Sequence, residues 1–214
     1  DPDAVLRTGE YLISLQMLGM LVGGILWGVW GDKRGRLSVL FGSIALYSLG
    51  NFFNAFVTNV PQYAVLRFIT GFGLAGELGA AITLVSEVLP KETRGYGTAV
   101  VAGVGVSGAI LANVVAHVEA STWARLTFGW IQLQPWQWTY ITGGVLGFAL
   151  LLLRIGVAES GMFRRQAKAA GVARGDLRML FTDWGRFRRY VQCMCIGLPI
   201  WFVAGIMVNF APET

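Results

Sequence analysis

The sequence predicts an all-α protein, a polytopic membrane helical bundle with six transmembrane helices. Of its 214 residues, 55% are apolar and only 14% are charged, and the mean hydropathy is +0.58. An ordinary soluble domain of this length does not tolerate such a composition on its surface. The charged residues are also clustered, and long uncharged stretches separate the clusters. These observations together place the chain in a bilayer.

Five uncharged runs each hold enough apolar residues for a helix that crosses the bilayer, which needs about 20 of them. The five runs are 11–31, 37–66, 95–118, 126–153 and 190–212. A further span is expected between residues 61 and 90, where Arg67 and Glu77 interrupt an otherwise apolar, glycine-rich segment. The 29 glycines of the chain fit this interpretation, because small residues let helices pack closely in lipid.

The positions of Lys and Arg predict the orientation of these helices. Basic residues gather in alternate connecting segments, at 33–36, 91–94 and 154–189, and are sparse in the others. By the positive-inside rule these three segments are cytoplasmic, and both ends of the chain then lie outside. This topology explains the net charge of +5. No basic module with interleaved aromatic residues points to nucleic acid as a partner.

The sequence offers no pattern typical of a catalytic or metal site. Cys193 and Cys195 lie two residues apart in the last expected span, so on a helix they point to different sides and form neither a disulfide nor a metal pair. His117 is the single histidine, and we expect it at the membrane interface. No nucleophile, base and orienting acid are arranged as an enzyme needs. We therefore expect no enzymatic activity, no metal and no cofactor.

Residues 28–37 read GVWGDKRGRL and lie between two long uncharged runs. The pattern of Gly, three residues, Asp, a base, any residue, Gly and Arg resembles the signature loop of the major facilitator superfamily of secondary transporters. The matching residues are Gly28, Asp32, Lys33, Gly35 and Arg36. Leu37 departs from the pattern, because the family usually has a base there. The alternative is an ordinary positively charged cytoplasmic turn.

The resemblance implies that the signature loop joins the second and third helices of a longer transporter, of which this chain is a fragment covering helices two to seven. Residues 1–157 would hold helices two to six of the N-terminal half, residues 158–186 the cytoplasmic connector between the halves, and residues 187–214 the first helix of the C-terminal half. The implied partners are a small-molecule substrate, protons, the lipid bilayer and the remaining helices. The implied location is a bacterial inner membrane.

Arg67 is the first candidate for a role in transport. A lone cation inside the membrane costs several kcal/mol unless an acid or an anionic ligand accompanies it. Residues 67–71 read Arg-Phe-Ile-Thr-Gly and resemble a family motif on helix four whose Arg faces the central cavity. The resemblance implies a part in substrate binding and proton coupling. Alternatively, Arg67 extends its long side chain to the outer interface and has a structural role only.

Glu77 and Asn113 are the other two candidates. Glu77 follows Arg67 about 15 Å further along the helix, close to the expected midplane, and apolar surroundings there favour its protonated form. The pair Gly76-Glu77 is similar to a Gly-Glu element of metabolite:proton symporters in the superfamily, which implies proton coupling. The alternative is a protonated structural Glu. Asn113 would add a polar group to an otherwise apolar cavity.

Charged residues at the cytoplasmic face are expected to form an inner gate together with the signature loop. Glu87, Arg94 and Gly95 resemble the family element Glu, Pro, Arg-Gly, and Glu159 with the serine after it resembles part of another family motif. Opposite charges on adjacent bundles hold the inner side shut in one state and separate in the other. The alternative is a set of solvated anchors that only fix the orientation.

These features predict uptake of a small organic acid or similar metabolite together with protons. Sugar porters of the superfamily carry glutamines on helix five, where Ala102 and Ala109 stand here. Drug:proton antiporters carry a Gly-Pro element on that helix, whereas residues 101–113 contain no proline. Both differences weaken the alternatives of sugar transport and of drug or metabolite efflux. A non-transporting scaffold or receptor on the same fold is the remaining alternative.

Overall fold

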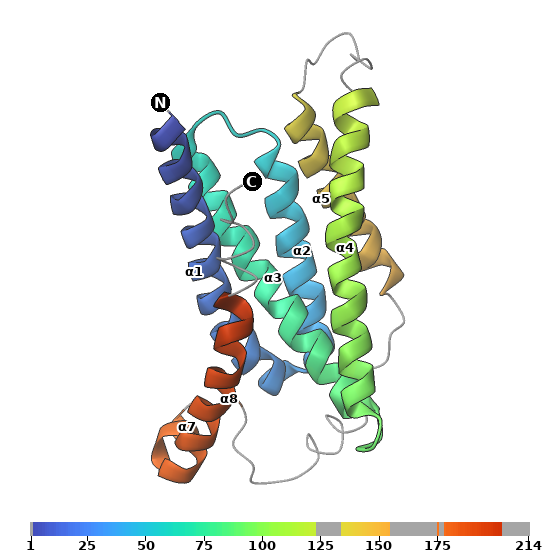
Figure 1. The fold of residues 1–214 in the computed structure, drawn as a ribbon. Helices are drawn as coiled ribbons and strands as arrows, with labels where there is room; N and C mark the ends of the chain where they lie inside the picture. Colours follow the sequence, from blue (N-terminus) through green and yellow to red (C-terminus); the bar gives the residue numbers. More distant parts are fainter. Residues whose placement is uncertain (1, 123–133, 155–174, 176–177, 203–214) are drawn as a thin grey trace. The chain divides into compact units, whose positions relative to one another are not determined.

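The computed structural model describes residues 2–122, 134–154, 175 and 178–202, and every regular element in them is a helix (Figure 1). The described helices are α1 (Pro2–Arg34), α2 (Arg36–Asn54), α3 (Val60–Val88), α4 (Arg94–Thr122), α5 (Pro135–Leu153), α7 (Arg178–Thr182) and α8 (Trp184–Phe202). The chain divides into two compact units, Asp1–Gly175 and Asp176–Thr214. This division falls inside the predicted connector at 158–186, while the domain limits at 157 and 186 stay predictions.

The all-α membrane fold is confirmed. Five of the described helices are long and apolar enough to cross a membrane, and they lie over Asp3–Arg34, Arg36–Asn54, Val60–Val88, Arg94–Val114 and Trp136–Leu153. The expected run at 37–66 is divided by the turn between α2 and α3. The sixth expected span, at 190–212, lies partly outside the described residues and stays a prediction.

Helix α3 is the central element of the first unit. It packs along α1 on one side and α2 on another, and α5 packs on α2. The buried apolar side chains at its contact with α2 are Val39, Leu40 and Ala80. Near the C-terminal end of α2, the contact with α3 includes a buried hydrogen bond, in which Asn54 Nδ2 donates to Thr70 Oγ1 at 3.4 Å. Hydrogen bonds between helices help association in lipid, where burial of apolar surface gives little preference for protein.

Glycines bring the backbones of α1 and α3 into direct contact. A Cβ atom at Gly19 or Gly23 would overlap backbone atoms of Phe68 or Phe72 on α3, and one at Gly71 would overlap the backbone of Gln16 on α1. Only residues without a side chain permit this approach, as in other closely packed membrane helices.

Single residues with clear local chemistry set the helix ends. Gly35 has φ of 99° and is the one residue between α1 and α2, and this conformation is easily reached only by glycine. Asn59 caps α3 by accepting a hydrogen bond from the Gln62 backbone N–H at 3.0 Å, and Pro61 occupies the first turn of that helix. Both are common signals for the start of a helix.

The close contact between α1 and α3 predicts that the same substitution at two neighbouring glycines changes stability by very different amounts. Gly23→Val should destabilise the fold by about 3 kcal/mol or more, because the added atoms meet backbone rather than a movable side chain. Gly24→Val should change stability little, since nothing lies within 4 Å of a Cβ at Gly24. Thermal unfolding of both variants in detergent tests this expectation. Equal unfolding temperatures would contradict the close α1–α3 packing.

Candidate functional site

The inner charge cluster, defined as Asp32, Arg36 and Glu87, joins three helices of the first unit. Arg36 Nη2 lies 2.9 Å from Asp32 Oδ1, and Arg36 Nε lies 3.4 Å from Glu87 Oε1. The side chains of Arg36 and Glu87 are 18% and 16% exposed, whereas that of Asp32 is 47% exposed. The structure thus brings together three of the residues that the sequence predicted for the inner gate, and their role as a gate stays a prediction.

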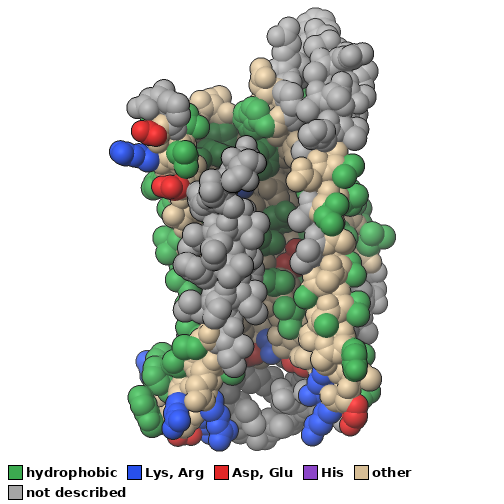
Figure 2. Space-filling model, viewed as in Figure 1, with side chains coloured by type: hydrophobic (Ala, Val, Ile, Leu, Met, Phe, Trp, Pro, Cys, Tyr) green, Lys and Arg blue, Asp and Glu red, His purple; other side chains and the backbone are tan. Residues whose placement is uncertain are grey.

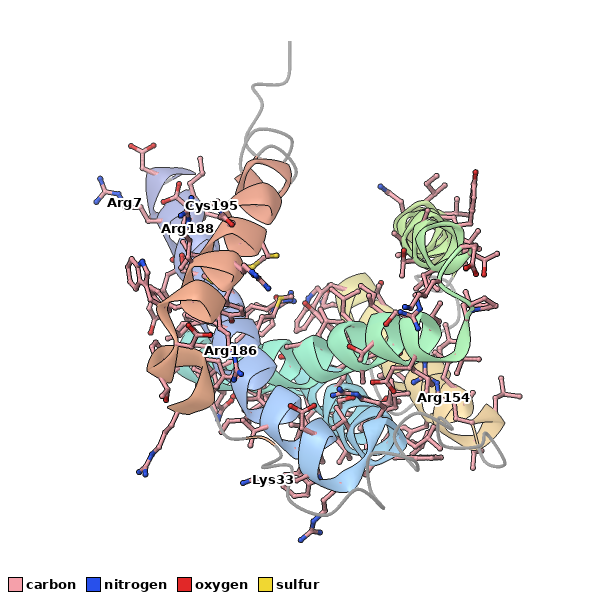
Figure 3. The ribbon with its side chains drawn as sticks, turned by 90° about the horizontal axis from the view of Figure 1, so that it is seen from below. Arg7, Lys33, Arg154, Arg186, Arg188 and Cys195 are labelled. Carbon is pink, nitrogen blue, oxygen red and sulfur yellow. The ribbon has the colours of Figure 1, made fainter. Side chains whose placement is uncertain are left out.

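Other predicted gate residues are placed differently. Arg94 donates from Nε to the carbonyl oxygen of Leu89 at 3.1 Å, so it caps the end of α3 and is not the partner of Asp32 in this structure. Gly95 begins α4 beside Arg94, and Lys33 is exposed at the end of α1 (Figure 3). Glu159 lies outside the described residues, and its place in the gate stays a prediction.

The signature loop also borders a small cavity between α1, α2 and α3. Its volume is about 150 Å³, and its lining includes Gly28, Trp27 and Arg36. The indole Nε1 of Trp27 donates to the carbonyl oxygen of Phe72 at 2.9 Å, which links α1 to α3 beside the cavity. The glycines of the loop therefore leave space next to the inner charge cluster.

The arginine cluster, defined as Arg67, Gln16, Tyr63 and Tyr140, lies among α1, α3 and α5. Arg67 Nη1 donates to Gln16 Oε1 at 3.1 Å, and Nη2 donates to the hydroxyl groups of Tyr63 and Tyr140. Arg67 Cζ also lies 4.8 Å and 5.2 Å from the centres of the two tyrosine rings. Such cation–π contacts add to the hydrogen bonds, so the guanidinium is held in place by three helices.

Within the described part of the chain, every group that accepts a hydrogen bond from Arg67 is uncharged. No carboxylate there lies within ion-pair distance of it. The charge of Arg67 is therefore solvated by protein but not neutralised. Arg67 can therefore bind an anion in place of its neutral acceptors, because hydrogen bonds between two charged groups are stronger than those to neutral acceptors.

Three members of this cluster were missed in the sequence. Gln16 is a polar residue inside an uncharged run and could have been noticed for that reason. Tyr63 precedes Arg67 by four residues, a spacing that puts two side chains on the same face of a helix. Tyr140 belongs to another helix, and nothing in the sequence connects it to Arg67.

Glu77 has a charged partner that the sequence analysis did not foresee. Arg154 Nη2 lies 3.2 Å from Glu77 Oε1, and the two side chains are 26% and 24% exposed. Arg154 caps the C-terminus of α5, a helix of 19 residues that is about 29 Å long, close to the thickness of the hydrocarbon layer. Glu77 therefore lies level with the C-terminal end of α5, and its expected place near the membrane midplane stays a prediction.

Asn113 is not part of either site in this structure. It lies on α4 with an exposed side chain, and no described hydrogen bond connects it to Arg67 or Glu77. Its expected role in the cavity stays a prediction.

A hollow of about 410 Å³ opens beside the arginine cluster, at the turn between α2 and α3 and the start of α5. The lining residues are Val57, Thr58, Asn59, Val60, Tyr63, Trp136 and Tyr140. Tyr63 and Tyr140 thus line the hollow, and their hydroxyl groups accept hydrogen bonds from Arg67. Figure 2 shows apolar side chains along the helices and charged ones mostly toward the helix ends. Among the described residues, no group of three His, Cys, Asp or Glu side chains could hold a metal ion.

Comparison with known proteins agrees with this arrangement. The family model of the Major Facilitator Superfamily matches residues 7–213. The chain belongs to the Major Facilitator Superfamily. It is therefore an integral membrane protein with several spans, and the resemblance of the signature loop is confirmed at the level of the family.

Two curated relatives align with most of the chain. The putative niacin/nicotinamide transporter NiaP of Bacillus subtilis strain 168 is 30% identical over 193 residues, which cover 90% of this chain and 44% of the relative. The 3-(3-hydroxy-phenyl)propionate transporter of Escherichia coli K12 is 28% identical over 204 residues, which cover 94% of this chain and 46% of the relative. The chain thus spans somewhat less than half the length of these relatives.

A solved structure shares the fold. The proton:xylose symporter XylE bound to 6-bromo-6-deoxy-D-glucose superposes with a TM-score of 0.68 at 18% identity, over 78% of this chain and 38% of that chain. At this identity the likeness concerns the arrangement of helices, which agrees with a partial fold of the superfamily.

The geometry of the inner charge cluster predicts unequal effects for its two acids. Glu87→Gln should destabilise the first unit by about 2 kcal/mol, because it removes the negative charge on α3 that pairs with the mostly buried Arg36. Asp32→Asn should cost less than about 1 kcal/mol, since its partly exposed pair is screened by solvent. Thermal unfolding of each variant at low and high salt checks this order. A larger loss for Asp32→Asn would show that the pair with Glu87 is the weaker one.

Proposed function

We propose that this chain is part of a secondary transporter that takes up a small organic acid together with protons by alternating access, in a bacterial inner membrane. The observation that carries the proposal is the arginine cluster. A permanent cation lies within a membrane-spanning helix, fixed by α1, α3 and α5, and its described acceptors are neutral. Membership in a superfamily of transporters supports the general class of activity.

The electrostatics of Arg67 favour an anionic ligand over a neutral one. An uncompensated charge in the membrane is costly, and a carboxylate that pairs with it removes part of that cost. The planar guanidinium presents paired donors that match the two oxygens of a carboxylate. A substrate carboxylate would therefore replace the tyrosine hydroxyls or Gln16 as the acceptor for Arg67. When no substrate is bound, an acid on another helix would occupy the same position.

The surroundings of Arg67 favour an acid with an apolar or aromatic body. The rings of Tyr63 and Tyr140 pack against the guanidinium and against each other, with centres 6.2 Å apart. Trp136 extends this aromatic surface, with its ring 6.2 Å from that of Tyr140. The names of the two curated relatives, which refer to niacin or nicotinamide and to a hydroxyphenylpropionate, support a substrate with an aromatic body.

Glu77 remains our candidate for the proton-coupling group, now with Arg154 as its partner. The Glu77 carboxylate forms an ion pair with the Arg154 guanidinium, and transfer of a proton to Glu77 would remove the negative charge from this pair. A proton that arrives at Glu77 would thus change the contact between α3 and α5 near the inner face. Asn113 has no place in this scheme among the described contacts.

The inner charge cluster fits a supporting role in alternating access. Asp32, Arg36 and Glu87 belong to helices of one unit, so their ion pairs hold the inner ends of these helices together. A gate requires partners that separate, which the other half of such a transporter would supply. We propose that Lys33, Arg94, Gly95 and Glu159 lie at that moving boundary, while the cluster itself keeps the bundle rigid.

The first test of this proposal concerns recognition of the carboxylate. In the protein expressed from its own gene, Arg67→Ala should weaken binding of an organic acid by tenfold or more, since a hydrogen bond to a charged group contributes about 1.5–3 kcal/mol. Arg67→Lys should recover only part of the affinity because the paired donors are lost. Binding of nicotinate and its neutral amide measures the preference for charge.

The matched control is Arg7→Ala, which removes an exposed cation near the N-terminus of α1 that has no described contact with Arg67, and which should leave binding unchanged. If Arg67→Ala keeps the full affinity and still prefers the acid over the amide, the carboxylate is recognised elsewhere.

The second test separates proton coupling from a structural role of Glu77. Glu77→Gln should abolish uphill accumulation while substrate exchange partly remains, because the amide resembles the protonated state but releases no proton. The double variant Glu77→Gln/Arg154→Gln removes both charges and relieves the unpaired cation. Proton-driven uptake and counterflow are measured for both variants. Recovery of accumulation in the double variant would show that the pair is structural and that the coupling acid lies elsewhere.

A further inference from the structure

The second unit carries an aromatic and basic surface that the transport mechanism does not use. Residues 178–189 contain four arginines and one aspartate. Three aromatic side chains from the end of α7 and the start of α8 pack together, with Phe187 lying 5.7 Å from Phe181 and 5.6 Å from Trp184 between ring centres. Phe181 and Trp184 remain 70% and 74% exposed. Large aromatic side chains this open to the surroundings mark an interaction surface.

The first three turns of α8 have one apolar and one polar face. At about 100° per residue, the apolar side chains fall within roughly a third of the circumference. These are Trp184, Phe187, Tyr190, Val191 and Met194. The opposite arc holds Gly185, Arg186, Arg188, Arg189 and Gln192. Helices α1, α3 and α5 of the first unit show no comparable segregation of apolar and polar side chains.

Asp183, the single acid of residues 178–189, already has partners at the start of α8. Asp183 accepts a hydrogen bond from the Gly185 backbone N–H at 3.0 Å, and its carboxylate lies 3.5 Å from Arg186 Nε. Arg188 and Arg189 have no carboxylate within ion-pair distance in the described part of the chain. Figure 3 shows Arg186 and Arg188 on α8. Two exposed cations thus lie on the face of α8 opposite its apolar, aromatic face.

We propose that α7 and the first three turns of α8 bind anionic phospholipid headgroups of the cytoplasmic leaflet, with the aromatic face in the interface and the arginines on the phosphates. Aromatic rings with apolar bodies prefer the boundary between acyl chains and headgroups. Basic residues close to that boundary attract anionic lipid. The positive-inside rule places this segment on the cytoplasmic side. The charge complementarity favours lipid over an apolar protein helix, which would need no arginines beside it.

This inference is independent of the transported substrate, because it concerns only the second unit. It predicts that anionic lipid fixes the start of α8 at the membrane surface. A transporter of this kind would then depend on the lipid composition of the membrane even if the arginine cluster binds a different substrate from the one proposed.

The two cysteines of α8 offer natural probe positions for a test. They lie roughly 160° apart around the helix, with Cys195 beside the apolar face and Cys193 on the arginine face, and both are exposed. The whole chain is reconstituted into phosphatidylcholine vesicles with and without added phosphatidylglycerol. A fluorophore is attached to Cys195 in a Cys193→Ser variant, or to Cys193 in a Cys195→Ser variant. Nitroxide-labelled phosphatidylglycerol and phosphatidylcholine serve as quenchers.

The probe on Cys195 should be quenched more strongly by the anionic lipid than by phosphatidylcholine. Arg188→Gln/Arg189→Gln should lower the relative binding constant for the anionic lipid by about 30-fold, given the usual contribution of each basic residue near the surface. Arg7→Gln/Lys91→Gln removes two exposed cations elsewhere and should leave the preference unchanged. The probe on Cys193 should be reached more readily by aqueous iodide than the probe on Cys195.

A second measurement needs no arginine variant, since added salt should reduce the preference for phosphatidylglycerol. Equal quenching by both lipids, a preference that survives in Arg188→Gln/Arg189→Gln, or a preference insensitive to salt would each overturn the proposal. Protection of Cys195 from both lipids would also overturn it, because the aromatic face would then be covered by protein. None of these outcomes depends on measured transport, so they are separate from a failure of the proposed function.

Discussion

The direct backbone contact between α1 and α3 is the constraint on which the rest of the first unit depends. Gly71 lies against the backbone of Gln16, and Gly19 lies against Phe68, the residue after Arg67. The contact therefore brings Gln16 of α1 within reach of the guanidinium on α3. Any side chain at these glycines would separate the helices and remove one of the groups that hold Arg67.

Helix α3 carries three charged side chains at intervals of ten residues, Arg67, Glu77 and Glu87, and each meets a different neighbour. Arg67 contacts α1 and α5, Glu77 meets the end of α5, and Glu87 pairs with Arg36 of α2. A spacing of ten residues corresponds to about 15 Å along a helix. The three polar contacts therefore lie at different depths, and together they fix α3 against three other helices.

The sequence was sufficient for the fold class, the first five spans and the family, because charge clustering and hydropathy are properties of the chain itself. It also identified Asp32, Arg36 and Glu87 as members of one cluster through a motif. Pairings between separate helices were harder to foresee. Arg154 was assigned to the cytoplasmic loop from its position after a span, and only the ion pair seen in the structure reveals that it reaches Glu77. Tyr140 was missed for the same reason, since helix packing determines its contact with Arg67.

The single residue between α1 and α2 has a mechanical consequence. Gly35 interrupts the helix with a left-handed backbone conformation, its N–H is still bonded to the carbonyl of Gly31 at 3.0 Å, and its own carbonyl accepts from Ser38 Oγ at 2.8 Å. The ion pair of Asp32 with Arg36 bridges the same interruption. A connection of one residue with these bonds leaves little freedom between the two helices. A tilt of α1 must therefore also move the start of α2, so the two helices move together.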